Sequence, residues 1–240
     1  NGDLLAQVDQ ADASLKSEQA KLDSLIKGTR SEEMAVESAK VENAKASLAD
    51  AKSNLVDKIQ DAYTKADDSV RNNTDSFFLN PKSATPKISF TVSDQSAGSE
   101  VESKRYSIEG MLKIWASSLS GLTTNSDLSV YSKEASENLG EIKSFLDKVS
   151  VLVNQLTPTS DLSQTLIDTY KGNTYSARTT TNTSVSNLTA AEEKLTTAMS
   201  ALSLAERNYD LKKAGTTLEN LNSQQALTAA AAANLKNIKT

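Results

Sequence analysis

Leucine and alanine recur at seven-residue intervals in two separated stretches of the chain. In residues 31–72, large apolar residues lie seven apart and alanines follow two of them by three: Met34, Val41, Leu48, Leu55 and Ala62, with Ala44 and Ala51. In residues 187–213, large and small residues alternate along one edge: Leu188, Leu195, Leu202 and Tyr209, with Ala191, Ala198 and Ala205. Such a repeat is typical of coiled-coil helices. It predicts two long helices with these seam residues: Leu48, Leu55, Leu188, Leu195 and Leu202.

Alanine at every second seam position lets two helix backbones approach each other closely. A chain that runs out along one seam and returns along the other would bury both seams, which predicts an antiparallel helical hairpin. A compact helical bundle obeys the same packing rules, so the pattern alone leaves both arrangements open.

Each long helix is separated from a shorter companion helix by a break that contains glycine. Basic residues precede the glycine, and Ser or Thr with acidic residues follows it, as expected where one helix ends and another is capped. The predicted structural turns consist of Gly28, Thr29 and Arg30 at the first break, and Gly215 and Thr216 at the second. We expect left-handed backbone at both glycines and companion helices over residues 9–27 and 218–238.

The middle of the chain differs in composition from the two seams. All four Phe and the only Trp lie within residues 77–145, so a compact core is predicted there. A loop with a short extended piece is expected over residues 72–98, followed by two helices over about 98–119 and 128–156. The residues expected on the buried faces of these helices are Val101, Ile108, Leu112 and Trp115 in the first, and Leu139, Ile142, Leu146, Val149 and Val153 in the second. Three aromatic residues are assigned to the core of this part, with a ligand pocket as the alternative: Trp115, Phe145 and Tyr106.

Together these elements predict an all-α fold. A long antiparallel coiled-coil hairpin carries short companion helices at its base and a four-helix bundle at its far end. The expected divisions are residues 1–72 for the outgoing helices, 73–160 for the inserted part of the bundle, and 161–240 for the return helices. The two long helices would supply the other two helices of the bundle.

Composition narrows the possible functions. The chain has no cysteine and no histidine, which excludes thiol nucleophiles, disulfides, imidazole bases and the commonest zinc ligands. A net charge of −5 without a basic patch argues against nucleic-acid binding. No stretch approaches the roughly 18 apolar residues of a membrane span. Carboxylate pairs and Ser/Lys neighbours lack catalytic or metal-binding contexts, so no enzyme activity, cofactor, metal or small-molecule substrate is predicted.

Short motifs around the seams resemble one family. Residues 2–12, Gly-Asp-Leu-Leu-Ala-Gln-Val-Asp-Gln-Ala-Asp, are similar to the stretch that ends the first half of the lipoyl-like domain in hemolysin-D-like membrane fusion proteins. Gly-Thr-Arg-Ser-Glu-Glu at 28–33 and Ala-Gly-Thr-Thr-Leu-Glu at 214–219 resemble the breaks of that family. The resemblance covers about residues 1–72 and 185–240. It implies that residues 1–8 end a lipoyl-like half-motif and that the chain is the helical hairpin of a periplasmic adaptor.

The resemblance also implies a function. A membrane fusion protein is an adaptor of an efflux or secretion transporter, so the expected partners are transporter subunits and further copies of the chain in a ring or tube. The expected location is extracytoplasmic, in the periplasm or at the cell surface. Two alternatives remain open at this point. One is an extracellular four-helix-bundle sensor that binds a small ligand at the aromatic residues, and the other is a coiled-coil adhesin.

Overall fold

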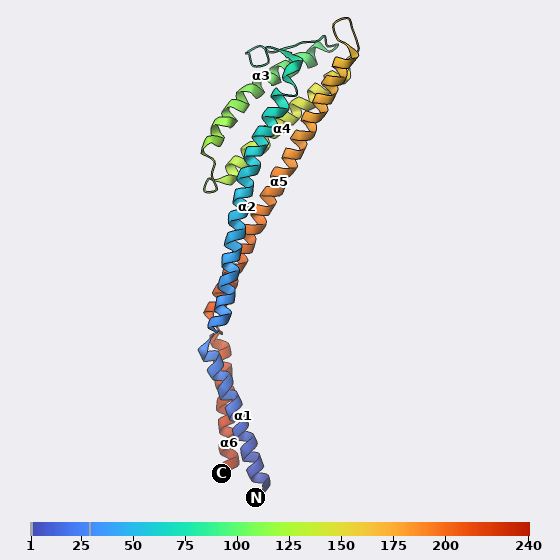
Figure 1. The fold of residues 1–240 in the computed structure, drawn as a ribbon. Coiled ribbons are helices and arrows are strands. Elements are labelled where there is room, and N and C mark those ends of the chain that lie inside the picture. Colours follow the sequence, from blue (N-terminus) through green and yellow to red (C-terminus); the bar gives the residue numbers. More distant parts are fainter. Residues whose placement is uncertain (1, 29) are drawn as a thin grey trace. The chain divides into compact units, whose positions relative to one another are not determined.

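The computed structural model describes residues 2–28 and 30–240, and most of these residues are helical (Figure 1). The all-α class is therefore confirmed. The helices in this described part are α1 (Gly2–Lys27), α2 (Ser31–Arg71), α3 (Gln95–Ser118), α4 (Leu128–Asn154), α5 (Gln164–Ala214) and α6 (Leu218–Lys239), with 3-10 turns η1 (Asp75–Phe77) and η2 (Leu119–Gly121). None of these helices has a segment long and apolar enough to cross a membrane.

The chain forms two compact units. The terminal unit consists of Asn1–Ala46 and Ser200–Thr240, and the central unit consists of Ser47–Met199. Both divisions fall inside the long helices α2 and α5, whereas the sequence pattern placed its divisions after residues 72 and 160. The reason is that the last part of α2 and the first part of α5 contribute to the core of the central unit.

In the terminal unit, α1 and α6 lie side by side (Figure 1). The backbone carbonyl of Glu18 accepts hydrogen bonds from the side chains of Gln224, at 3.2 Å, and Thr228, at 3.3 Å. Ala11 and Leu235 are buried, and Leu15, Leu22 and Leu25 of α1 are half-buried. Residues 2–8 form the first turns of α1.

Two breaks with the same local geometry separate the helices of the terminal unit. Gly28 and Gly215 both have a φ of 72°, and each donates its N–H to a carbonyl three residues earlier, at 3.3 and 3.2 Å. The carbonyl two residues after each glycine, from Arg30 or Thr217, then accepts the first hydrogen bond of the next helix. Glycine adopts this left-handed conformation without the penalty of a Cβ atom, which explains why it occupies both positions.

The predicted cap by Ser or Thr is present at the second break. Thr217 caps α6, because its Oγ1 accepts the Asn220 N–H at 3.3 Å. At the first break the equivalent position is Arg30, whose guanidinium instead pairs with Glu33 at 3.1 Å. Thr29, the remaining residue assigned to this turn, lies outside the described residues.

The central unit encloses one hydrophobic core supplied by α2, α3, α4 and α5. The positions that the sequence pattern assigned to the inner faces of α3 and α4 are buried: Val101, Ile108, Leu112, Trp115, Leu139, Ile142, Leu146, Val149 and Val153. Asp94 and Asp127 cap the N-termini of these two helices by accepting backbone N–H groups. Asp94 and Asp127 thus fix where α3 and α4 begin.

A short antiparallel pair of strands, β1 (Phe78–Leu79) and β2 (Lys87–Ile88), covers part of this core. Phe78 pairs with Ile88, and Leu79 pairs with Lys87. The loop between the strands begins at Asn80, which has a φ of 50°. This loop forms one wall of the candidate site.

The predicted seam residues have graded burial. Leu55 and Leu188 are buried in the central unit, at 1% and 2% exposure. Leu48 and Leu195, also in that unit, are half-buried, as is Leu202 in the terminal unit. A helix in a two-helix layer covers only one side of its partner, so intermediate burial is expected wherever no third helix is present.

Candidate functional site

The structure separates the three aromatic residues that the sequence grouped together. Trp115 is fully buried and meets Tyr63 edge-on, with ring centroids 5.4 Å apart. Phe145 is also fully buried and stacks on Phe78 at 6.3 Å. Tyr106 is 54% exposed, so its assignment to the core was wrong. It precedes Trp115 by about two and a half helical turns, which places it on the opposite face of α3.

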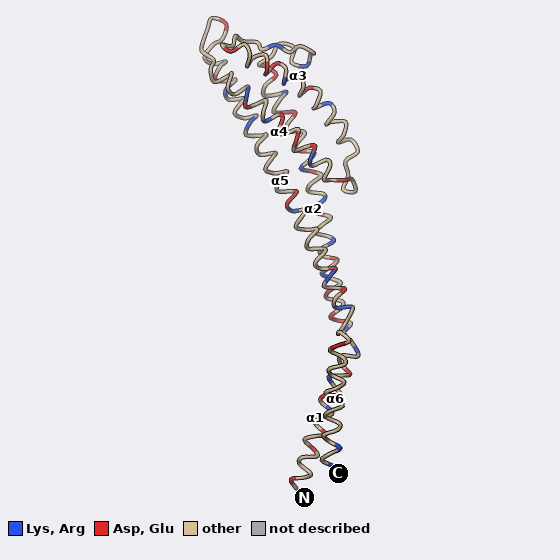
Figure 2. Tube along the Cα trace, turned by 180° about the vertical axis from the view of Figure 1, so that it is seen from behind, with Lys and Arg blue, Asp and Glu red and all other residues tan. Residues whose placement is uncertain are grey.

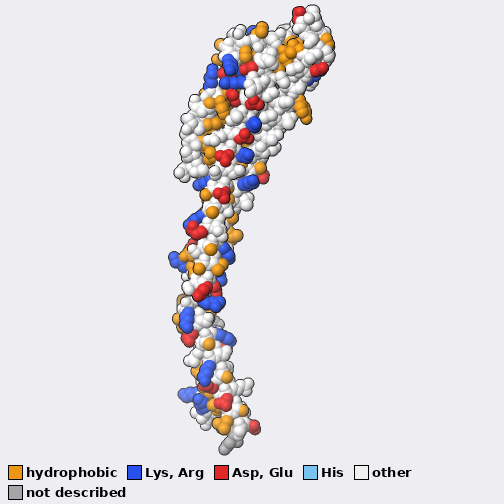
Figure 3. Space-filling view, in the orientation of Figure 1, with side chains coloured by type: hydrophobic (Ala, Val, Ile, Leu, Met, Phe, Trp, Pro, Cys, Tyr) orange, Lys and Arg blue, Asp and Glu red, His pale blue; other side chains and the backbone are white. Residues whose placement is uncertain are grey.

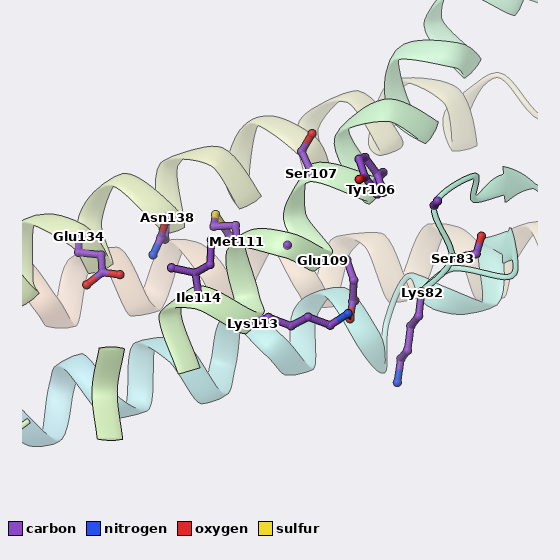
Figure 4. A pocket seen from close by; sticks show the side chains of 12 residues that line it. Lys82, Ser83, Tyr106, Ser107, Glu109, Met111, Lys113, Ile114, Glu134 and Asn138 are labelled. Carbon is purple, nitrogen blue, oxygen red and sulfur yellow. The ribbon is translucent and has the colours of Figure 1, made fainter. Parts of the chain in front are cut away.

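An open groove of about 690 Å³ lies beside Tyr106 in the central unit. Figure 4 shows that three segments line it: the loop after β1, which carries Lys82 and Ser83; the outer face of α3; and α4, which carries Glu134 and Asn138. The groove is therefore built from elements that the core beneath α3 holds in place.

The floor of the groove is the outer face of α3. Tyr106, Gly110 and Ile114 follow one another at four-residue spacing, so they lie along one line of the helix. Ile114 is 70% exposed, and Met111 beside it is half-buried. A Cβ atom added at Gly110 would meet nothing within 4 Å, so this glycine leaves open space in the floor. Hydrophobic side chains at the surface over α3 are visible in Figure 3.

Charged side chains surround this apolar floor. Lys113 lies 3.5 Å from Glu109, which also contacts two arginines, and both residues line the groove. Farther along the groove, Glu134 accepts hydrogen bonds from Ser118 at 3.0 and 3.1 Å. Lys82 has no carboxylate partner among the described residues. The ammonium of Lys82 is therefore the charge of the groove that no carboxylate of the described chain neutralises.

A buried ionic network lies beneath the groove and connects α2, η1 and α3. Arg105 is fully buried, and its guanidinium contacts Asp75 at 2.7 Å and Glu109 at 3.3 Å. Glu109 also contacts Arg71 at 3.2 Å, and Arg71 contacts Asp67 at 3.0 Å. Each buried charge thus has an opposite partner, which is the condition under which buried charges are tolerated.

Tyr63 lies where the network meets the aromatic core. Burial raises the pKa of its phenol, and the negative charge of Asp67 acts in the same direction. Arg71 acts in the opposite direction. The phenol therefore stays neutral at physiological pH and acts as a packing group, not as a base.

Two further cavities of more than about 400 Å³ lie in the described part of the chain, one in each unit. In the central unit, a groove of about 570 Å³ lies among residues 88–93, the end of α4 and the start of α5, and many of its side chains carry hydroxyls. In the terminal unit, a cavity of about 440 Å³ lies at the two breaks and includes Gly28, Met34 and Gly215. Neither contains a paired nucleophile and base.

The chemistry of the groove beside Tyr106 suits binding. Its hydroxyl groups, from Ser83, Ser107 and Tyr106, have no imidazole or thiolate beside them, because the chain contains neither His nor Cys. Within residues 2–28 and 30–240, no three His, Cys, Asp or Glu side chains are grouped so that they could hold a metal ion. An apolar floor with charges at its margin is the common form of a surface that recognises another molecule.

Sequence reasoning missed the ionic network, although the signal for it was present. Arg105 and Glu109 lie four and eight residues after Val101, which places both on the buried face of α3 with Ile108 and Leu112. A charged residue on an otherwise apolar helix face predicts a buried partner of opposite charge. The identity of that partner, Asp75, could not be read from the helix itself.

Comparisons with known proteins identify no relative of this chain. No family model matches it, and no curated protein or solved structure matches it either. The resemblance to membrane fusion proteins therefore rests on the short motifs around the seams and breaks.

Proposed function

We propose that this chain is a non-enzymatic connector, the helical hairpin of an adaptor in a bacterial efflux or secretion assembly. In this role α2 and α5 pair as an antiparallel coiled coil that spans distance, and the exposed surfaces of the helices contact partner proteins. The observation that carries the proposal is the fit of large to small residues along the two seams.

The fit depends on one register between α2 and α5. Ser69 donates its hydroxyl to the carbonyl of Ala177 in the central unit, and Glu33 lies 3.7 Å from Lys212 in the terminal unit. The separation in sequence between Glu33 and Ser69 on α2 nearly equals the separation between Ala177 and Lys212 on α5. Both contacts therefore agree with a single antiparallel register. Under that common register the facing seam residues are Val41 with Ala205, Ala44 with Leu202, Leu48 with Ala198, Ala51 with Leu195, and Leu55 with Ala191. Every large residue then faces an alanine, which is how two helices interlock at close distance.

The twin breaks support the same arrangement. In a hairpin, residues at the same level on the two long helices meet, and Gly28 and Gly215 both line the cavity of the terminal unit. The ion pair of Glu33 with Lys212 joins the start of α2 to the last turn of α5 beside these glycines. The two matched breaks are also among the motifs that resemble the membrane fusion family.

As an adaptor, the chain would work outside the cytoplasm, with transporter subunits as partners and with further copies of itself in a ring or tube. The alternation of Lys with Glu and Asp along α1 and α2, visible in Figure 2, suits helices that stay solvated between their contacts. The sensor alternative has less support, because Trp115 and Phe145 are enclosed in the core and line none of the three cavities described above.

Disulfide trapping tests the hairpin. The chain contains no cysteine, so pairs of cysteines can be introduced without background. We expect Val41→Cys with Ala205→Cys, and Leu48→Cys with Ala198→Cys, to oxidise within one chain, giving a monomer of altered mobility on a non-reducing gel. The control pair is Ala39→Cys with Asn208→Cys, at the same level but on exposed positions. Equal trapping of the control pair, or trapping only between chains, would contradict the hairpin.

The adaptor role needs a second measurement. Cross-linking in the native membrane, with the full-length gene product carrying a photoreactive residue at Ala39, should link it to a transporter subunit identified by mass spectrometry. Linkage to a signalling protein, or no linkage to any membrane transporter, would contradict the adaptor role and leave the hairpin result standing.

A further inference from the structure

We infer that the groove beside Tyr106 is a docking site for a peptide segment of a partner protein, one that presents an aliphatic side chain next to a carboxylate. This inference rests on the connector role proposed above, because it names the kind of partner that the connector would hold. It concerns the central unit alone and does not depend on the register of α2 and α5.

The floor selects an aliphatic side chain. Ile114 and Tyr106 are 70% and 54% exposed, and Met111 is half-buried between them and α4. Contact with an aliphatic group would remove this apolar surface from water, which is favourable. Methionine side chains adapt their shape, and aromatic side chains offer a large contact area at low entropic cost.

Gly110 makes the floor accessible. Its neighbours on the same face of α3 are Tyr106 and Ile114, and an added Cβ atom at Gly110 would have no heavy atom within 4 Å. Glycine is a poorer helix former than alanine, so this position lowers the stability of α3 but leaves a depression between two exposed apolar side chains.

The charged residues at the margin of the groove determine which sign of charge the partner should carry. Lys82, Glu109 and Lys113 lie on one side of the groove in Figure 4. Arg71 and Arg105 are balanced by Asp67 and Asp75, which leaves the charge of Glu109 to neutralise Lys113. Lys82 has no carboxylate partner among residues 2–28 and 30–240. The net charge on this side of the groove is therefore positive, which is complementary to a carboxylate.

The three methionines of the chain provide a direct readout. Methyl-labelled methionine in the full chain gives one signal each for Met111 in the groove, for Met34 in the terminal unit, and for Met199, which is 56% exposed elsewhere. The probes are acetyl-Leu-Asp-Leu-amide and its Asn and Lys counterparts. We expect the Asp peptide to shift the Met111 signal alone, with an affinity about two- to fivefold above that of the Asn peptide.

Three variants complete the test. Gly110→Leu fills the depression and should abolish the shift of Met111, whereas Gly172→Leu, at an exposed helical glycine with the same open surroundings on α5, should leave it unchanged. Lys82→Gln should remove the preference for Asp over Asn.

Several results would overturn the inference: no shift of Met111 at millimolar peptide, equal shifts of all three methionines, equal affinity for the three peptides, or binding that survives Gly110→Leu. A shift of Met111 that depends on protein concentration without peptide would also overturn it, by assigning the groove to a second copy of the chain. If peptide binding fails but disulfide trapping succeeds, the hairpin proposal stands and the docking site is rejected. If trapping fails but peptide binding succeeds, the docking site stands and the hairpin is rejected.

Discussion

Arg105 on α3 directs both its Nε and its Nη2 to a single carboxylate oxygen of Asp75, at 2.9 and 2.7 Å. Arg105 is fully buried, while the Asp75 side chain is 16% exposed. This bond fastens the turn after α2 to the middle of α3. The network around Arg105 thus holds the helix whose outer face forms the floor of the groove.

Removing Asp75 should leave a buried guanidinium with one carboxylate fewer. We expect Asp75→Ala to lower the free energy of unfolding by about 2–4 kcal/mol, because an uncompensated buried charge is costly. Urea unfolding followed by circular dichroism measures the effect. The matched control is Glu100→Ala, which breaks an exposed pair with Lys148 and should cost under about 1 kcal/mol. Equal effects of the two substitutions would show that the network contributes no more than a surface pair.

The two faces of α3 should respond differently to truncation. Trp115→Ala creates a cavity in the core and should cost about 3–5 kcal/mol of unfolding free energy. Tyr106→Ala removes an exposed ring and should change it by less than about 0.5 kcal/mol. Thermal or urea unfolding of both variants distinguishes the two faces. A large loss of unfolding free energy for Tyr106→Ala would show that this side chain is buried.

Substitution of the glycines at the breaks should destabilise the protein, whereas substitution of a glycine inside a helix should stabilise it. Gly28→Ala and Gly215→Ala force a Cβ atom into a backbone at φ 72°, and each should cost about 1–2 kcal/mol. Gly172→Ala should stabilise α5 by about 0.5–1 kcal/mol, because alanine is the better helix former. Asn at either break should be milder than Ala, since it tolerates this conformation. If Gly28→Ala were neutral, the left-handed turn would not be required.

Acid should loosen the contact between α1 and α6. Hydrogen bonds from Lys21 and Gln224 hold the pKa of the Glu18 carboxyl below its ordinary value. A carboxyl with a lowered pKa in the folded state contributes stability above its unfolded pKa, about 4.3, and the contribution is lost as the pH falls through the folded value. We therefore expect faster amide exchange in both helices at pH 3 than a simple pH correction gives.

The control for this pH effect is Glu18→Gln, which keeps a hydrogen-bonding side chain but cannot ionise. It should raise exchange in α1 and α6 at pH 7 and reduce the difference between pH 7 and pH 3. Unchanged pH dependence in this variant would assign the acid effect to Asp12, whose pKa the hydrogen bond from Lys16 likewise lowers.

The sequence predicted the helices better than the surfaces between them. Periodicity located the buried faces of α3 and α4. Apolar residues at helical spacing share one face of the helix, so Leu112 and Ile142 are buried together with the other apolar residues on their faces. It misplaced Tyr106, because an aromatic residue was assigned to the core by type and not by its angle around the helix. The bond of Arg105 to Asp75 joins residues 30 positions apart through a loop, and helical periodicity carries no information about such a contact.

The groove was also beyond the reach of sequence patterns. Its floor depends on the absence of a side chain at Gly110, and its wall depends on the course of the loop that carries Lys82. Neither has a periodic signature. The breaks, in contrast, were predictable, because a glycine between a basic helix end and an acidic helix start has a local physical cause that needs no distant partner.

Gly28 and Gly215 have a consequence for how disorder spreads in the terminal unit. An α-helix melts from its ends inward, because each hydrogen bond depends on the one before it. At both glycines that ladder is interrupted, so fraying that starts at Gly2 in α1 or at Lys239 in α6 would stop at the breaks and not continue into α2 or α5. The two glycines thus limit fraying to α1 and α6. We expect this helix pair to unfold and refold as a cooperative segment separate from α2 and α5.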